Sequence, residues 1–254
     1  ITYRIAHMLD EGIAQSAILA LTFTNKAARE MEERIKSLTG KKLQNLTVST
    51  FHAFGVRILR QDIDKLGWRE NFSIYDETDK ASLIKESARE LQFTSDALDL
   101  YKIANLFSNI KTGRKNWETA NDMYRALYES YERGLKLYNA VDFDDLIMRT
   151  VDLLRENPLI AEHYHRRFRH ILVDEYQDTN HAQYVLVRAL VGDGSDGVDP
   201  AELTVVGDSD QSIYAFRGAT IRNIEEFERD FTGARTILLE QNYRSTQNIL
   251  SAAN

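Results

Sequence analysis

Residues 171–178 read Ile171-Leu172-Val173-Asp174-Glu175-Tyr176-Gln177-Asp178. A short apolar run that ends in two adjacent carboxylates is typical of a strand buried on both faces of a parallel sheet. Residues just beyond the carboxyl end of such a strand lie where open α/β sheets bind ligands. The stretch therefore predicts an α/β fold with a candidate ligand site at Asp174 and Glu175.

The chemistry of this pair suits a nucleotide phosphate. Asp174 could hold Mg²⁺, which favours oxygen ligands and substrate phosphates, and Glu175 could orient or deprotonate a water. The same design recurs where the apolar run Leu203–Val206 opens into Gly207-Asp208-Ser209-Asp210-Gln211. Acidic residues at strand ends are also common in solvated turns, so this alternative stays open for the pair taken alone.

Composition limits the class of protein. The 254 residues suffice for one large domain or two ordinary ones, and the absence of cysteine excludes disulfides and thiolate metal sites. No apolar run approaches the ~20 residues of a membrane span, and no signal peptide is visible, so we expect a cytoplasmic protein. A net charge of -7 argues against a uniformly basic nucleic-acid coat but leaves room for a local basic groove.

The order of expected elements suggests two kinds of structure. Apolar strands at 17–23 and 46–49 alternate with amphipathic helices, and this rhythm predicts a parallel sheet. Residues 76–156 instead show continuous helical periodicity with two glycines and no proline, which predicts an all-helical insertion. Strands resume at Ile171, and Thr236–Leu239 is expected to be the last strand before a helix from Ser245.

Polar residues follow the first two expected strands. In Thr22–Ala28, small polar side chains and free helix N–H groups could hold a phosphate, and Phe23 could support a base; simple helix capping is the alternative. In Thr50-Phe51-His52, the histidine could donate to a phosphate oxygen, although a lone histidine is more often a structural hydrogen-bonding group.

Two later segments carry aromatic and basic side chains. Tyr214, Phe216 and Arg217 interleave rings with a cation, a pattern that suits stacking on single-stranded bases, or alternatively core packing. In Gln241–Ser245, an arginine could neutralise charge on a transferred phosphoryl group, and a tyrosine could stack on a purine.

Taken in order, these segments resemble the UvrD/Rep (PcrA-like) family of superfamily 1 DNA helicases. The matching text is LTFTNKAAREMEERI, VSTFHAFGVRILR, VDFDDLI, ILVDEYQDTN, VVGDSDQSIYAFRGA and LEQNYRST. The resemblance implies a RecA-like parallel sheet domain (1A) formed by residues 1–60 and 167–254. It also implies that an all-helical insertion domain (1B) at 61–166 interrupts this sheet domain.

The resemblance also assigns roles to residues. It implies ATP and Mg²⁺ as cofactors, with Asp174 as the metal carboxylate and Glu175 as the catalytic base. Gln211 and Arg244 then act on the γ-phosphate, and Tyr243 stacks on adenine. Single-stranded DNA and single-strand/duplex junctions are the implied partners, contacted by Phe23, Thr24, Asn25, His52, Phe143, Tyr214, Phe216 and Arg217. At Phe216 the family more often has Trp.

One departure from the family pattern concerns the phosphate loop. The chain contains no G-x-x-x-x-G-K-[ST] motif. The resemblance implies that this loop precedes Ile1 and that a second motor domain follows Asn254, so the 254 residues would hold half of a nucleotide site. We therefore expect a fragment of an ATP-dependent DNA helicase that translocates on single-stranded DNA. A non-catalytic single-stranded-DNA-binding or regulatory module, and the helicase half of a helicase–nuclease, are the alternatives.

Overall fold

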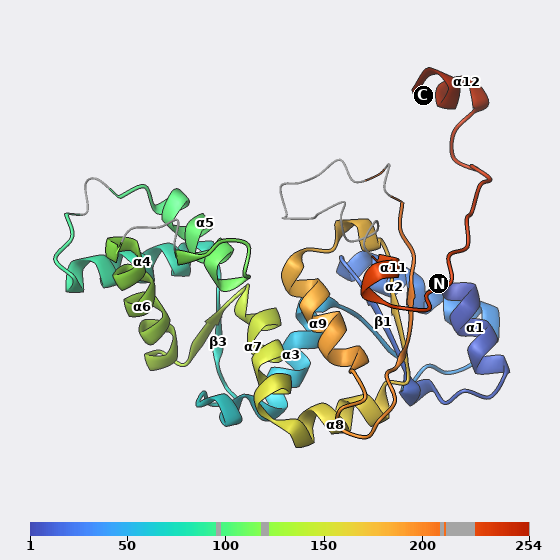
Figure 1. Ribbon diagram of the computed structural model, residues 1–254, viewed down its shortest axis with the longest axis horizontal. Helices are drawn as coiled ribbons and strands as arrows, with labels where there is room; N and C mark the ends of the chain where they lie inside the picture. Colours follow the sequence, from blue (N-terminus) through green and yellow to red (C-terminus); the bar gives the residue numbers. More distant parts are fainter. Residues whose placement is uncertain (95–97, 118–121, 209–210, 212–226, 254) are drawn as a thin grey trace.

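The protein is built around a four-stranded parallel sheet with the strand order β2-β1-β5-β6. The computed structural model describes residues 1–94, 98–117, 122–208, 211 and 227–253 (Figure 1). The strands are β1 (Ile18–Thr22), β2 (Thr47–Thr50), β5 (His170–Val173) and β6 (Glu202–Val205). A parallel sheet with helical connections confirms the predicted α/β class.

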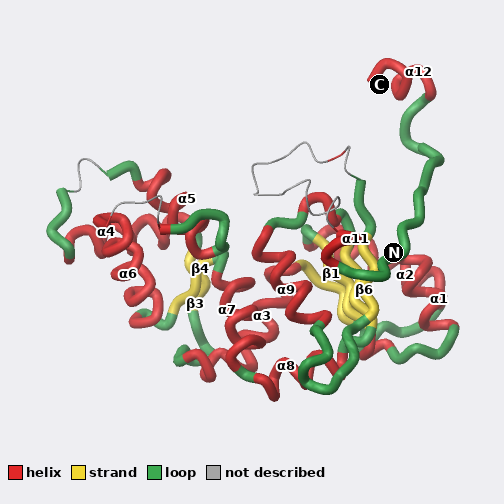
Figure 2. Tube along the Cα trace, in the orientation of Figure 1, coloured by secondary structure: helices red, strands yellow, loops and turns green. Residues whose placement is uncertain are grey.

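Helices cover both faces of the sheet (Figure 2). Successive side chains of a strand point to opposite faces. Ile18, Ala20 and Leu172 therefore pack with α1 (Thr2–Asp10) and α2 (Asn25–Thr39). The alternate strand residues join the core formed with α3 (Phe51–Asp62), α7 (Asp145–Glu156), α8 (Pro158–Arg167) and α9 (His181–Val191); they are Leu19, Leu21, Ile171 and Val173. Burial on both faces explains the continuous apolar runs in the sequence.

A second hydrophobic core lies to one side of the sheet (Figure 1). It joins α4 (Glu77–Glu90), α5 (Leu100–Lys111) and α6 (Asp122–Leu137) through Leu83, Ile103, Phe107, Leu127 and Tyr131. The expected all-helical character of this block is wrong in one respect, because β3 (Ser73–Tyr75) and β4 (Ala140–Asp142) form a two-stranded parallel sheet. Segments of three residues are too short to show the alternation that marks a strand in the sequence.

The helix α7 and all but the last residue of α8 fall inside the predicted 61–166 range, yet both helices pack on the sheet. Ile147, Val151 and Leu154 of α7 belong to the same cluster as Leu19 and Leu21 of β1. Helical periodicity reports that a helix buries one face but not which core it joins. The predicted domain boundaries at 61 and 166 stay a prediction, while the second cluster has its fully buried members between Leu83 and Ala140.

The C-terminal part differs from the expected strand at Thr236–Leu239. These residues belong to no strand of the described structure, and Leu239 is 84% exposed. An apolar run becomes a strand only where a neighbour supplies backbone partners, and across the described residues this run has no strand beside it. It follows α11 (Phe227–Asp230) and leads to α12 (Gln247–Ala253), which lies away from the body of the protein (Figure 1).

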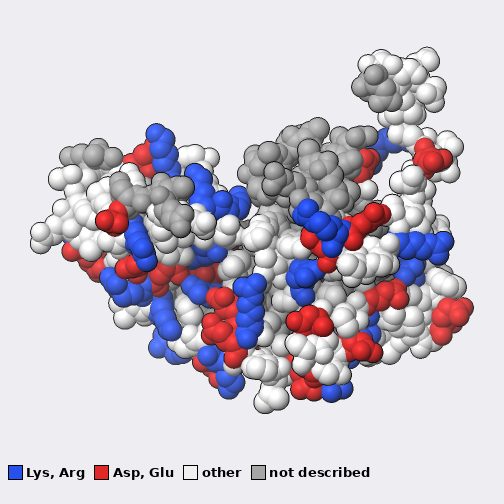
Figure 3. Space-filling model, in the orientation of Figure 1, with Lys and Arg blue, Asp and Glu red and all other residues white. Residues whose placement is uncertain are grey.

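Over the described residues, no helix is long and apolar enough to cross a membrane. Acidic and basic side chains are intermixed over the face that Figure 3 shows. Short 3₁₀ helices occupy Gln15–Ala17, Ile63–Leu66 and Tyr176–Asp178.

Candidate nucleotide and DNA site

The parallel strands bring four polar loops to one edge of the sheet. Thr22 of β1 is in register with Thr50 of β2, Leu21 with Val173 of β5, and Val173 with Val205 of β6. The residues that follow these strands therefore share the carboxyl edge. The DNA candidates Phe23, Thr24, Asn25 and His52 follow β1 and β2, and the acidic nucleotide candidates follow β5 and β6, so these two sets lie on neighbouring halves of one edge.

The acidic pair sits in a strained turn directly after β5. The Asp174 amide donates to the Leu21 carbonyl at 3.1 Å, which keeps this residue in line with the sheet. Glu175 has φ 49° and ψ 46°, in the left-handed region that non-glycine residues rarely adopt. Its amide donates to Asp174 Oδ1 at 3.0 Å, and the turn leaves the Glu175 side chain exposed. Such strain is frequently kept at functional sites.

A chain of hydrogen bonds joins the β5 loop to the β6 loop. Gln177 Nε2 donates to Glu175 Oε2 at 2.6 Å, and the Asp208 amide donates to Gln177 Oε1 at 3.1 Å. Gln211 Nε2 then donates to Asp208 Oδ2 at 2.8 Å. Gln177 is buried, so its amide fixes the Glu175 carboxylate relative to the next loop. Gln177 and Asp208 carry no role predicted from the sequence, although both occur in the acidic segments.

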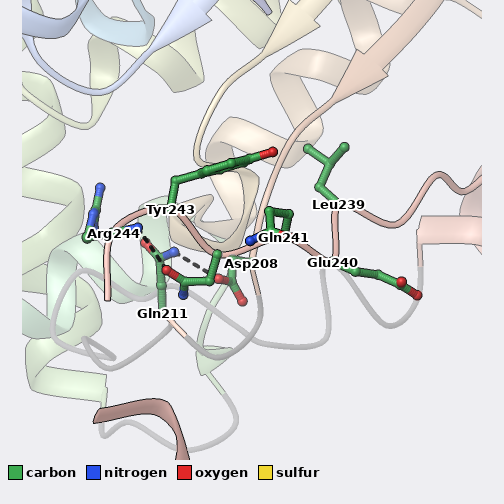
Figure 4. A pocket seen from close by; sticks show the side chains of 8 residues that line it. Asp208, Gln211, Leu239, Glu240, Gln241, Tyr243 and Arg244 are labelled. Carbon is green, nitrogen blue, oxygen red and sulfur yellow. Dashed lines mark hydrogen bonds between the residues drawn. The ribbon is translucent and has the colours of Figure 1, made fainter. Parts of the chain in front are cut away.

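Gln211 also borders a pocket formed with the C-terminal segment (Figure 4). The pocket holds about 550 Å³ and is lined by Asp208, Gln211, Leu239, Glu240, Gln241, Asn242, Tyr243 and Arg244. Asn242 Oδ1 accepts from the amides of Arg244 and Ser245 at 2.9 Å each, which shapes the turn carrying Tyr243. The predicted nucleotide residues Gln211, Tyr243 and Arg244 thus surround one space, and Tyr243 is 92% exposed.

The described DNA candidates fall into two groups at the other half of the edge. Thr24 Oγ1 accepts from the Ala27 amide at 3.0 Å and caps α2, with Asn25 exposed beside it, while the Phe23 ring lies 5.4 Å from that of Phe51. The His52 ring stacks on Phe143, with centroids 3.9 Å apart and planes 18° apart. The predicted contacts Tyr214, Phe216 and Arg217 lie outside the described residues.

The close approach of α3 and α7 makes this stack possible. His52 and Gly55 lie one helical turn apart on α3, and Phe143 precedes α7. A Cβ atom built on Gly55 would lie 2.1 Å from the Leu146 carbonyl oxygen, so only the missing side chain permits this helix spacing. A backbone contact at Gly55 therefore positions two aromatic rings that are distant in the sequence.

Comparison with known proteins shows the family of this chain. The sequence model described as the UvrD/REP helicase N-terminal domain matches residues 1–232. The chain belongs to this family.

Relatives of this UvrD/REP chain extend the similarity to its C-terminal segment. It is 54% identical over 268 aligned residues to the ATP-dependent DNA helicase UvrD1 of Mycobacterium tuberculosis, with all of this chain and 35% of the relative covered. It is 46% identical over 263 residues to the ATP-dependent DNA helicase PcrA of Staphylococcus aureus, again with all of this chain and 35% of the relative covered. The chain thus spans about a third of the length of these relatives.

The electrostatics of the acidic pair fit a bound cation. Burial and the neighbouring Glu175 carboxylate raise the pKa of Asp174, whereas the hydrogen bond from the Glu175 amide acts in the opposite direction. Across the described residues, no group of three His, Cys, Asp or Glu side chains could hold a metal ion. Asp174 of this UvrD/REP chain could hold a hard cation, a kind of ion that also accepts oxygens from phosphates and water.

We expect His52 of this UvrD/REP chain to be neutral at pH 7. Burial against Phe143 lowers the pKa of His52 to about 4. The imidazole can then hydrogen-bond to a phosphate without adding charge. Because the folded pKa lies below the unfolded value of ~6.5, its contribution to stability is present above pH ~6.5 and is lost as the pH falls through about 4.

Histidine side-chain NMR measures this directly, with the His52 signal identified by its absence in His52→Asn. Between pH 8 and pH 5 the resonance should move by no more than about a tenth of its full titration shift. A titration midpoint near the ordinary histidine value would show that the ring is solvated.

Proposed function

We propose that the chain is part of the motor of an ATP-dependent DNA helicase that couples ATP hydrolysis to movement along single-stranded DNA and to duplex unwinding. The observation that carries this proposal is the shared sheet edge. The nucleotide candidates after β5 and β6 and the DNA candidates after β1 and β2 lie on adjacent hydrogen-bonded strands. The printed names of the relatives, which call them ATP-dependent DNA helicases, support the same function.

In the nucleotide half, Asp174 would hold Mg²⁺ together with the ATP phosphates, where the ion neutralises phosphate charge. Glu175 accepts a proton from the attacking water, and Gln177 keeps its carboxylate in place through the 2.6 Å hydrogen bond. Gln211, linked to Glu175 through Asp208 and Gln177, contacts the γ-phosphate. Arg244 neutralises charge on the transferred group, and the exposed Tyr243 ring stacks on adenine.

In the DNA half, exposed rings receive bases of the single strand. Phe143 is 54% exposed although one of its faces stacks on His52, so the ring combines a fixed position with an accessible surface. Phe23, Thr24 and Asn25 extend this surface along the sheet edge, and Tyr214, Phe216 and Arg217 contribute further stacking and charge. Single-strand/duplex junctions on the nucleoid in the cytoplasm are the proposed substrate.

Replacing Phe143 with Ala in the full-length protein should weaken binding of single-stranded DNA by ~1–3 kcal/mol, because one stacking platform is lost. Affinity for the nucleotide should stay unchanged. The loss should be similar for oligonucleotides of different sequence, since every base offers a face for stacking. Fluorescence anisotropy with labelled oligonucleotides measures it.

Tyr101→Ala is the matched control, because it removes a ring that is 82% exposed on α5 away from the sheet edge. Equal affinities of Phe143→Ala and the parent would contradict the DNA role of this ring. Stimulation of ATP hydrolysis by single-stranded DNA in the full-length protein distinguishes a motor from a non-catalytic DNA-binding module, which would bind the strand without turnover.

A further inference from the structure

A buried cluster of charges lies directly behind Phe143. Lys111, the last residue of α5, has a side chain only 4% exposed. Its Nζ lies 2.6 Å from Glu132 Oε1 on α6, 2.7 Å from Asp142 Oδ2 at the end of β4 and 3.1 Å from Asp145 Oδ1 at the start of α7. One ammonium group therefore joins four elements of the fold.

The two aspartates in this cluster bracket Phe143. The Asp142 amide donates to Asp145 Oδ2 at 3.0 Å, and the Asp145 amide donates to Asp142 Oδ1 at 3.0 Å. These reciprocal bonds fix the turn that contains Phe143 and Asp144. Tyr131 adds a hydrogen bond from its hydroxyl to Asp142 Oδ2 at 2.9 Å. The backbone that presents the Phe143 ring is thus held by carboxylates that Lys111 contacts.

Charge balance makes Lys111 necessary to this arrangement. Burial opposes the charged form, but Asp145, Asp142 and Glu132 outweigh it and hold the pKa of Lys111 well above its usual range. Burial and the nearby Asp142 carboxylate raise the pKa of Asp145 above its usual range. Arg149 contributes a second cation, with Nη2 2.6 Å from Glu132 Oε2 and Nε 3.2 Å from Asp145 Oδ1. Removal of Lys111 would leave buried carboxylates without their central partner.

We propose that Lys111 is a positioning residue for DNA binding, which acts through Asp142 and Asp145 to hold Phe143 against His52. The inference rests on the proposed role of Phe143 in DNA binding. It also gives the helices α5 and α6 a defined connection to the DNA surface. Lys111 itself is buried and contacts no ligand, so its effect reaches the DNA only through the orientation of the ring.

The test uses Lys111→Met in the full-length protein. Affinity for single-stranded DNA should fall by at least ~5-fold, up to the loss seen in Phe143→Ala, while nucleotide affinity stays unchanged. In the double variant Lys111→Met/Phe143→Ala, affinity should equal that of Phe143→Ala alone, because both changes remove the same interaction. Additive losses in the double variant would overturn the proposal.

A spectroscopic measurement distinguishes a change in the position of the Phe143 ring from a loss of protein stability. 4-Fluorophenylalanine is introduced at position 143 and nowhere else, and its ¹⁹F shift reports the stack on His52. In Lys111→Met this shift should move toward the value found in His52→Ala, and an unchanged shift would overturn the proposal. Leu127→Ala is the control, because it truncates a fully buried side chain in the core of α4, α5 and α6 without touching the charges. It should leave both the shift and the DNA affinity unchanged, and an equal loss in this control would show a purely structural effect.

A replacement variant and the ¹⁹F shift allow the positioning role of Lys111 to be tested separately from the role of Phe143 in DNA binding. If Lys111→Met does not fold, Lys111→Met/Glu132→Gln removes one buried carboxylate together with the ammonium and leaves the Asp142 and Asp145 side chains in place, and the same outcomes are expected. If Phe143→Ala binds DNA normally, the role of the ring in DNA binding is refuted, and with it any effect of Lys111 on DNA. The ¹⁹F shift would in that case still show whether Lys111 positions the ring.

Discussion

Glu175→Gln in the full-length protein should lower ATP turnover at least ~10²-fold, the scale expected when a general base is lost. Glutamine has nearly the same size and can still contact Gln177, but it cannot accept a proton from water. ATP binding should therefore stay close to that of the parent. Steady-state hydrolysis in the presence of single-stranded DNA gives kcat, and a fluorescent nucleotide analogue gives the dissociation constant.

Two further variants test the role of the acidic pair and provide a control. Asp174→Asn should weaken binding of the Mg²⁺-nucleotide as well as turnover, because the proposed metal carboxylate is lost. Glu33→Gln makes the same chemical change as Glu175→Gln at an exposed position on α2, and it should leave both quantities unchanged. Equal turnover in Glu175→Gln and the parent would remove Glu175 from the mechanism.

Gly55→Leu should destabilise the fold by about 3 kcal/mol, at the upper end of the usual range for overpacking. A Cβ on this residue would lie 2.1 Å from the Leu146 carbonyl oxygen and 3.2 Å from Thr150 Oγ1, so α3 and α7 must separate. Thermal unfolding should show a drop in Tm of roughly 6–12 °C for a chain of this size. The folded fraction should also bind single-stranded DNA less tightly, because separation of the helices pulls His52 from Phe143.

The matched control is Ala53→Leu, which places the same side chain on an exposed position of α3. Leucine is nearly as good a helix former as alanine, so its Tm should stay within about 2 °C of the parent. If both leucine variants melt at the parent temperature, the close contact between the two helices does not constrain the fold.

Buried regular elements are the part of this fold that the sequence predicts well. The apolar runs at β1 and β5 are covered by helices on both faces, so a local pattern carries the whole signal. The small strands β3 and β4 are not predicted, because three residues are too few to show the alternation of apolar and polar side chains. The strand predicted at Thr236–Leu239 is wrong for a different reason. An apolar run indicates a preference for burial but does not supply a neighbouring strand.

Some residues of the candidate site can likewise be predicted from the sequence, and others cannot. Asp174 and Glu175 are visible because they directly end a buried strand. The role of Gln177 depends on the left-handed turn at Glu175, which directs one amide toward two loops, and composition does not reveal such a turn. The His52–Phe143 stack depends on the spacing of two helices, and Lys111 reaches three carboxylates from three other elements. Contacts of this kind become apparent only in three dimensions.

The outer side of β6 affects how the chain behaves at high concentration. β6 is terminal in the strand order, so over the described residues its outer N–H and C=O groups face no further strand. The run Ile237–Leu239 is a second candidate, because its apolar side chains are exposed and it belongs to no strand of the described structure. Unpaired strand edges are templates for joining one molecule to another. We therefore expect concentrated solutions of the 254-residue chain to self-associate edge to edge, and a lysine placed within Ile237–Leu239 should reduce this association.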